Sequence, residues 1–396
     1  MRKLLVLPGT CDSLGGMIVS FSMLIKGFHR CQASEQLCFL VRAGSLVERY
    51  LQHEVGSLSL HSINASNQTQ FVKQSLSWVS QQPKDWPLLL ENCVNSQALS
   101  TLAFAAIKLR LSGRPIYYSF HDQARSYNLL GNLVRKLTFT CLSPRAICNS
   151  EFTASRIRAL VPHVCGILYP AVDLEERFNP RLPVGPPPAE LQPILNSGAR
   201  VMLTASRISK PGGVNDKNLR ALFPVLAQLK AKGHHYHGVV IGLDTSPEKC
   251  QTRALLEQAE IYGIADRFTV LPPTFTIKDY YNYTDVLVTL APREPFGLTV
   301  VEAIACGVPV VGSETGGVGE SLRNIAPEWT VNPENPTAVA DTIIRVASDP
   351  HTPQLLSQGR RWVEAHCSPV EYAKKIIDMT ELNEISLPLT LKSAER

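Results

Sequence analysis

The stretch DVLVTLAPREPFGLTVVEAIACGVPVVGSETGGVGE, residues 285–320, contains a strand, a loop, a helix and a second strand in succession. The run DVLVTLAP has the composition of a buried strand, GLTVVEAIACG has helical periodicity, and VPVVGSE leads into a glycine-rich turn. Strands that alternate with helices form parallel sheets. The stretch therefore predicts an α/β fold, with a loop, a helix N-terminus and a glycine turn at one edge of a sheet.

The same alternation extends over the rest of the chain. The short apolar runs KLLVLPG, LCFLV, PLLLENC, PIYYSFHD, RAICNS and GILYPAVD precede a proline-rich segment, and RVMLTAS, HGVVIGLD and RFTVLPP follow it. Because 396 residues are about twice the length of an ordinary domain, two domains are the natural expectation. We predict two Rossmann-like α/β domains.

The proline-rich segment sets the expected domain boundaries. It contains six prolines in FNPRLPVGPPPAELQPILNSG and has no amphipathic period, which is typical of a linker. The predicted organisation is an N-terminal domain over 1–176, a linker over 177–198, a C-terminal domain over 199–368, and a helix with a tail over 369–396. We expect that last helix to pack back toward the N-terminal domain.

Composition narrows the class of protein. The chain is 44% hydrophobic and 18% charged, which is ordinary for a folded protein. Its ten cysteines are scattered among apolar neighbours without a CxxC pair, so we interpret them as reduced core thiols. The sequence shows neither a signal-peptide pattern nor an apolar run of the roughly 18 residues that span a bilayer, and a cytoplasmic location is expected.

Charge is distributed unevenly along the chain. Residues 1–170 carry 17 Lys and Arg against 8 Asp and Glu, whereas the remainder carries 22 against 26. A basic half can be a dispersed solvated surface, or it can attract an acidic acceptor or the surface of an anionic membrane. If the basic residues attract a membrane, the N-terminal domain would make peripheral contact with the bilayer surface. Basic residues are not interleaved with aromatic ones, so nucleic acid is not expected as a partner.

The opening stretch places candidate ligand-binding groups at the edge of the predicted sheet. Gly297, Leu298 and Thr299 occupy a helix N-terminus, where unpaired N–H groups favour phosphate. Glu294 and Glu302 stand eight residues apart on either side of this turn, and carboxylates accept hydrogen bonds from sugar and ribose hydroxyls. The alternative is that both glutamates only stabilise the helix N-terminus electrostatically.

The segment EPFGLTVVEAIACGVPVVG resembles the Glu-x7-Glu signature of the family 4 retaining glycosyltransferases, including its PFG, EA and G-x-PVV elements. The resemblance implies a GT-B architecture, in which two Rossmann-like domains face their parallel sheets across a cleft. In this architecture 1–176 would be the acceptor-binding domain and 199–368 the donor-binding domain. It also implies that Glu302 holds the donor ribose and that Glu294 holds the sugar hydroxyls. The backbone from Phe296 to Thr299 would then surround the diphosphate.

The family also places cations on the loop after the first strand of its C-terminal domain. In TASRISKPGGVNDKNLRALF, Arg207 matches this position, and Lys217 matches the family's Lys-Asn turn, although it lies farther along than usual. Lys210 lies nearer to Arg207 and stays an alternative. Cations here would stabilise the charge that develops on the leaving nucleotide diphosphate.

Further positions match the family outside the signature. His121 ends the run PIYYSFHD, where the family has a histidine that faces the donor sugar, and Gly15 and Gly16 resemble its N-terminal Gly-Gly loop. The backbone around Val270 to Thr274 is expected to hold the nucleobase, and by resemblance the turn at Gly316 and Gly317 approaches the donor. In GILYPAVD, a Pro-Ala pair replaces the family's Asn-Gly, which puts one acceptor-side contact in doubt.

These features predict a metal-independent, retaining hexosyltransferase in glycan, glycolipid or glycoconjugate biosynthesis. No cofactor is expected beyond a UDP- or GDP-linked sugar as co-substrate, and the acceptor would be a sugar, a lipid-linked group or a small molecule. Two alternatives stay open: a nucleotide-sugar-binding protein without catalysis, and another two-domain enzyme such as a sugar-nucleotide epimerase or a phosphorylase. Product analysis separates them.

Overall fold

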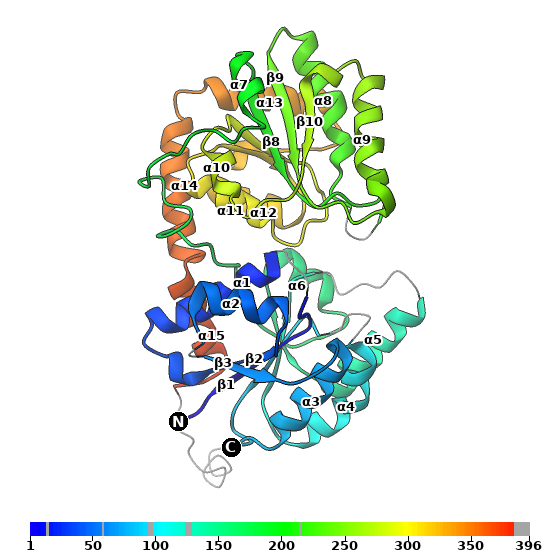
Figure 1. Cartoon of the computed structure of the whole chain (residues 1–396), viewed down its shortest axis with the longest axis vertical. Helices are drawn as coiled ribbons and strands as arrows, with labels where there is room; N and C mark the ends of the chain where they lie inside the picture. The colour runs from blue at the N-terminus through cyan, green and yellow to red at the C-terminus, as the bar shows by residue number, and fades with distance from the viewer. Residues whose placement is uncertain (13–15, 58, 94–97, 123–128, 214–215, 384–396) are drawn as a thin grey trace. The chain divides into compact units, whose positions relative to one another are not determined.

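The computed structural model describes the chain except residues 13–15, 58, 94–97, 123–128, 214–215 and 384–396. It divides into two units (Figure 1). Unit 1 comprises Met1–Asn149, Thr153–Ala171 and Pro369–Arg396, and unit 2 comprises Ser150–Phe152 and Val172–Ser368. The segment predicted as a linker, 177–198, thus falls inside unit 2.

Unit 1 contains a seven-stranded sheet in the order β3-β2-β1-β4-β5-β6-β7, in which each neighbouring pair is parallel. Its strands are β1 (Leu4–Pro8), β2 (Leu37–Arg42), β3 (Leu60–Ile63), β4 (Leu88–Glu91), β5 (Ile116–Phe120), β6 (Arg145–Cys148) and β7 (Val164–Ile167). Its helices are α1 (Gly16–Arg30), α2 (Leu46–Val55), α3 (Gln68–Ser80), α4 (Leu99–Leu111), α5 (Leu129–Leu142) and α15 (Pro369–Met379), together with α6 (Glu151–Ile157), of which Glu151 and Phe152 are assigned to unit 2.

The apolar runs of unit 1 are explained by helices that cover both faces of its sheet. Leu5 and Leu7 of β1 belong to the core beneath α3, α4 and α5, whereas Leu4 and Val6 belong to the core that contains α1, α2 and α15. A strand that is buried on both faces reads as a continuous hydrophobic run rather than an alternating one. The last helix, α15, packs against α1 in unit 1 (Figure 1).

Unit 2 contains a six-stranded parallel sheet in the order β10-β9-β8-β11-β12-β13. Its strands are β8 (Arg200–Ala205), β9 (Tyr236–Ile241), β10 (Phe268–Leu271), β11 (Val286–Thr289), β12 (Val310–Ser313) and β13 (Thr330–Val331). Its helices are α7 (Gln192–Asn196), α8 (Leu222–Ala231), α9 (Cys250–Ile261), α10 (Ile277–Tyr281), α11 (Leu298–Ala305), α12 (Gly316–Ile325), α13 (Pro336–Ser348) and α14 (Thr352–His366).

Both sheets have the strand order of the doubly wound Rossmann fold, which confirms the predicted fold class. The order reverses between β1 and β4 in unit 1 and between β8 and β11 in unit 2. Ligands bind such sheets beyond the carboxyl ends of the strands at this reversal. Over the described ranges, no helix has the length and apolar composition that crossing a membrane requires.

Candidate functional site

The predicted residues of unit 2 follow the carboxyl ends of its parallel strands. Arg207 comes after β8, Thr274 after β10, and Glu294 after β11. The glycine turn that begins α12 comes after β12. Because the strands are parallel, these loops meet at one edge of the sheet, and two of them flank the reversal between β8 and β11.

The glycine turn supports the loop that carries Glu294. The Gly317 N–H donates to the Glu294 carbonyl at 2.7 Å, and the Thr315 hydroxyl donates to the Pro292 carbonyl at 3.0 Å. A Cβ on Gly317 would lie 2.2 Å from the Pro295 carbonyl oxygen, so a side chain there would displace the loop. The turn therefore positions the loop through its own backbone.

The start of α11 has the features of an anion site. Its N-cap, Gly297, has a left-handed φ of 86°, and no side chain caps the helix. Phe296 is buried and anchors the preceding loop, while Leu298 and Thr299 begin the helix half-buried. Uncapped N–H groups and the positive end of the helix dipole together favour a phosphate at this position.

Lys217 forms an ion pair with the Glu294 carboxylate, and both side chains are about one-fifth exposed. Next to Lys217, the Asp216 carboxylate accepts hydrogen bonds from the N–H groups of Gly212 at 2.6 Å and Asn218 at 2.9 Å. Burial raises the pKa of Asp216, but these hydrogen bonds outweigh it and lower the pKa. The structure thus brings together two of the predicted residues that lie 77 positions apart.

The other predicted site residues of unit 2 are Lys210, Arg207 and Thr274. Lys210 is exposed and takes part in no ion pair recorded for the described residues, so the contact with Glu294 favours Lys217. Arg207 is also exposed, beyond the end of β8. The Thr274 hydroxyl accepts the N–H of Thr276 at 3.0 Å and so closes a local turn after β10.

Glu302 is the most perturbed carboxyl group of the predicted set. It lies in α11 with 8% of its surface exposed and accepts a hydrogen bond of 3.0 Å from the Tyr281 hydroxyl. Burial raises the pKa of Glu302 to about 7, although this hydrogen bond and the charge of Arg177 oppose the rise. A carboxylate that is disfavoured by burial gains most from new hydrogen-bond donors, such as a pair of hydroxyl groups.

In unit 1, His121 belongs to a polar cluster at the ends of β4 and β5. Its Nε2 lies 2.6 Å from Glu91 Oε2 and 3.0 Å from the Ser119 hydroxyl oxygen. Burial lowers the pKa of His121, but the charge and hydrogen bond of Glu91 and the charge of Asp122 outweigh it, so the pKa is raised. The cluster therefore holds a protonated imidazole at neutral pH more readily than a free histidine would.

Sequence reasoning did not identify Glu91. It stands at the end of the run PLLLENC, where a carboxylate with 2% exposure is unusual in a parallel strand. An acidic residue that ends a buried run, beside a histidine that ends the next one, is the signal that could have found this pair. Gly16 is the first residue of α1, and Gly15 lies outside the described residues.

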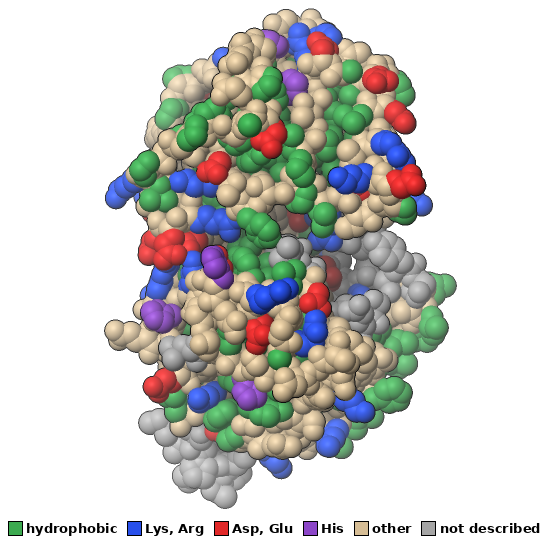
Figure 2. Space-filling model, in the orientation of Figure 1, with side chains coloured by type: hydrophobic (Ala, Val, Ile, Leu, Met, Phe, Trp, Pro, Cys, Tyr) green, Lys and Arg blue, Asp and Glu red, His purple; other side chains and the backbone are tan. Residues whose placement is uncertain are grey.

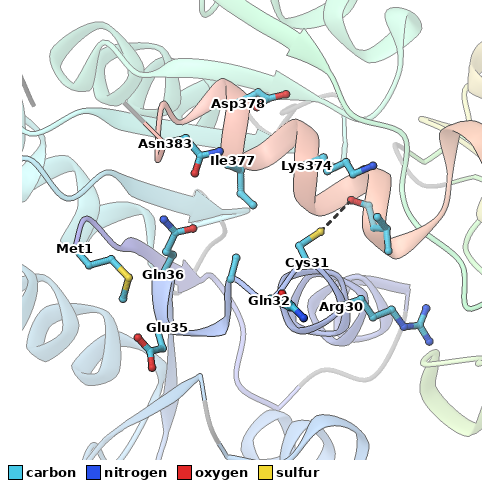
Figure 3. A pocket seen from close by; sticks show the side chains of 12 residues that line it. Met1, Arg30, Cys31, Gln32, Glu35, Gln36, Lys374, Ile377, Asp378 and Asn383 are labelled. Carbon is cyan, nitrogen blue, oxygen red and sulfur yellow. Dashed lines mark hydrogen bonds between the residues drawn. The ribbon is translucent and has the colours of Figure 1, made fainter. Parts of the chain in front are cut away.

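Unit 1 also has a hollow of about 690 Å³ at the end of α1 (Figure 3). Arg30 and Lys374 lie at its rim from α1 and α15, and the Cys31 thiol donates to the Val370 carbonyl at 3.8 Å. None of the predicted residues lines it. Among the residues that the structure describes, no group of three or more His, Cys, Asp or Glu side chains is arranged to hold a metal ion.

The family model described as "Glycosyl transferases group 1" matches residues 194–365. A D-inositol 3-phosphate glycosyltransferase of Thermomonospora curvata is 28% identical over 268 residues, which cover 62% of this chain and 61% of the relative. The enzyme of the same description from Mycolicibacterium gilvum is 31% identical over 221 residues, which cover 52% of this chain and 46% of the relative. The alignments thus span about half to three-fifths of these relatives.

Among solved structures, Anabaena HepE in complex with UDP-glucose superposes with a TM-score of 0.73 at 16% identity, over 96% of this chain and all of that one. At this identity the likeness shows the fold, which is GT-B. The match of residues 194–365 to the group 1 glycosyltransferase model confirms the resemblance that the sequence suggested.

Proposed function

We propose that this chain is a retaining glycosyltransferase that moves a hexose from a nucleotide-diphosphate sugar to an acceptor hydroxyl. The observation that carries the proposal is the edge of the unit 2 sheet, where an uncapped helix N-terminus lies between Glu294, paired with Lys217, and the buried Glu302. A phosphate site with a carboxylate on each side suits a ligand that has a diphosphate with a hydroxyl-bearing group at either end.

In the proposed reaction, the bond between the anomeric carbon and the diphosphate oxygen breaks, and the acceptor oxygen bonds to that carbon from the same face. The leaving phosphate oxygen takes the proton of the acceptor hydroxyl. Arg207 and Lys217 stabilise the negative charge that grows on the diphosphate. Lys217 would exchange its contact with Glu294 for the phosphate, which frees the Glu294 carboxylate for sugar hydroxyls.

We assign the donor to unit 2 and the acceptor to unit 1. His121 is proposed to contact a substrate hydroxyl, and Glu91 is proposed to act as its positioning residue, because it holds the imidazole at 2.6 Å and favours its charged form. The proposal requires no metal and no cofactor besides the nucleotide sugar. It therefore expects turnover to be unchanged by a chelator.

The comparisons guide the choice of substrates for testing. Because a solved structure of this fold contains UDP-glucose, UDP sugars are our first choice of donor, with GDP sugars second. Relatives described as D-inositol 3-phosphate glycosyltransferases make a phosphorylated polyol one acceptor to test, beside sugars and lipid-linked groups.

The first experiment is a thermal-shift screen of the wild type and Glu302→Ala against UDP, GDP, ADP and their sugar conjugates. Stabilisation by one nucleotide that the variant loses supports the donor site, and stabilisation by none of them contradicts the proposal. Nuclear magnetic resonance of the products then distinguishes the reaction types. Transfer with the donor's anomeric configuration is expected, whereas binding without turnover would favour a non-catalytic binding protein, and an epimerised nucleotide sugar would favour an epimerase.

A further inference from the structure

The outer faces of α4 and α5 in unit 1 expose an unusual amount of apolar surface. The described residues include fourteen exposed large hydrophobic side chains, and seven of these lie on the two helices. They are Phe104, Ile107 and Leu111 on α4, and Leu129, Leu130, Leu133 and Leu137 on α5. Figure 2 shows hydrophobic side chains gathered along the edge of unit 1 that these helices form.

The two sets lie on neighbouring helices, and together we call them the α4–α5 face. Phe104, Ile107 and Leu111 are spaced by three and four residues, so they lie on one side of α4. Leu133 and Leu137 have the same spacing on α5. The two helices are in extensive contact, and the Arg110 guanidinium donates to the Thr140 carbonyl at 3.4 Å between them. A solvent-facing helix ordinarily presents polar side chains on its outer side, whereas α4 also exposes Phe104, Ile107 and Leu111 there.

The charge on this face has one sign. Neither α4 nor α5 contains Asp or Glu, whereas Lys108, Arg110, Arg135 and Lys136 are basic. Lys108 and Lys136 are exposed, and no ion pair is recorded for either among the described residues. Exposed Phe and Leu beside unpaired lysines are the composition of a helix that lies in the interface of an anionic membrane.

From this combination we propose that the α4–α5 face binds the surface of an anionic lipid bilayer, with its Phe and Leu side chains in the acyl boundary and its lysines among the lipid headgroups. A second copy of this chain fits the face less well. In a two-fold symmetric dimer the same patch meets itself, so the lysines of both copies would be brought together without acidic partners. The proposal does not depend on glycosyl transfer, and its test uses no nucleotide.

The test is co-sedimentation of the full chain with vesicles of phosphatidylcholine alone and of phosphatidylcholine with phosphatidylglycerol. We expect binding to the anionic vesicles that weakens as salt screens the lysines. Replacing both lysines, in Lys108→Gln/Lys136→Gln, should weaken the partition about fivefold for each lysine. Replacing two apolar side chains, in Phe104→Gln/Leu111→Gln, should weaken it about tenfold or more for each residue.

A matched control removes exposed apolar side chains elsewhere. Ile261 and Phe275 are 74% and 59% exposed in unit 2, so Ile261→Gln/Phe275→Gln changes the same kind of surface and should bind as the wild type does. All of these positions are exposed, and unchanged thermal unfolding checks that the variants fold. Absence of wild-type binding to anionic vesicles, or equal losses in the control, overturns the proposal. A dimer in solution that Phe104→Gln/Leu111→Gln dissociates, without vesicle binding, overturns it in favour of a second copy.

Discussion

Replacing Glu302 by glutamine tests the electrostatics of the candidate donor site without any ligand. The glutamine has the shape of the carboxyl group and its oxygen can still accept the Tyr281 hydroxyl, but it carries no charge. In the wild type, burial raises the pKa of Glu302 from 4.5 to about 7, although the Tyr281 hydrogen bond and the Arg177 charge lower it. The variant therefore isolates the cost of ionising a buried carboxyl group.

The magnitude follows from the two pKa values. Their difference corresponds to about 3 kcal/mol of unfolding free energy, since one pKa unit is about 1.4 kcal/mol. The unfolded chain releases the proton near pH 4.5, whereas the folded chain keeps it until about pH 7. The unfolded state thus binds fewer protons in this window, and the wild type loses stability as the pH rises through it. Above pH 7 the cost is constant.

We therefore expect Glu302→Gln to equal the wild type below about pH 4.5 and to be up to about 3 kcal/mol more stable above pH 7. Urea unfolding at half-unit pH steps measures the difference. Glu260→Gln is the control, because Glu260 is exposed on α9 and its replacement should shift stability by less than about 0.5 kcal/mol. A difference between Glu302→Gln and the wild type that does not change with pH would refute the reasoning.

The same carboxyl group links nucleotide binding to pH if the proposed donor site is right. Ribose hydroxyls would hydrogen-bond to the ionised form, so binding below pH 7 should release a proton. Calorimetry in two buffers of different ionisation enthalpy measures that release. Glu302→Gln should bind UDP about 10 to 100 times more weakly, since a hydrogen bond to a charged group contributes about 1.5–3 kcal/mol. Equal affinity would place the ribose elsewhere.

Three further predictions concern the other parts of the site. Without the Glu91 carboxylate, burial should dominate at His121, so Glu91→Gln should lower the pKa of its imidazole, and an NMR titration that shows no decrease would contradict the pairing. If the Lys217 ammonium stabilises the leaving diphosphate, Lys217→Met should lower kcat about 100-fold or more in transfer assays. An unchanged kcat would mean that another cation stabilises the diphosphate. Gly317→Ala should lower the free energy of unfolding in urea by about 1–3 kcal/mol, because the new Cβ would overlap the Pro295 carbonyl. Gly185→Ala should be nearly neutral, because a Cβ at Gly185 would have open space around it. Equal effects of the two substitutions would argue against the close contact at Gly317.

The apolar runs predicted most of the strands, but two edge strands, β3 and β13, were not predicted. β3 has the polar-interrupted sequence LHSI, and β13 has two residues, Thr330 and Val331. Both lie at an edge of their sheet, where a strand pairs on one side only. Such strands need not be buried on both faces, so neither a long hydrophobic run nor a clear alternation marks them.

The segment predicted as a linker shows a similar limit. Within it Gln192–Asn196 form α7, and the whole segment belongs to unit 2. Tyr283, which follows α10, donates its hydroxyl to the Gly185 carbonyl within this segment. Contacts of that kind join residues 98 positions apart, and no local pattern reports them.

The sequence by itself determined the α/β class, the loop–helix signature from Glu294 to Glu302 and the family it resembles, because these depend on local periodicity and on residues close together in the chain. The tertiary structure alone decided the pairing of Lys217 with Glu294, the pairing of His121 with Glu91, and the burial that raises the pKa of Glu302. Strand order sets which loops become neighbours, and burial depends on everything packed around a group. Neither the contacts between these loops nor the burial of these groups is defined until the sheets have formed.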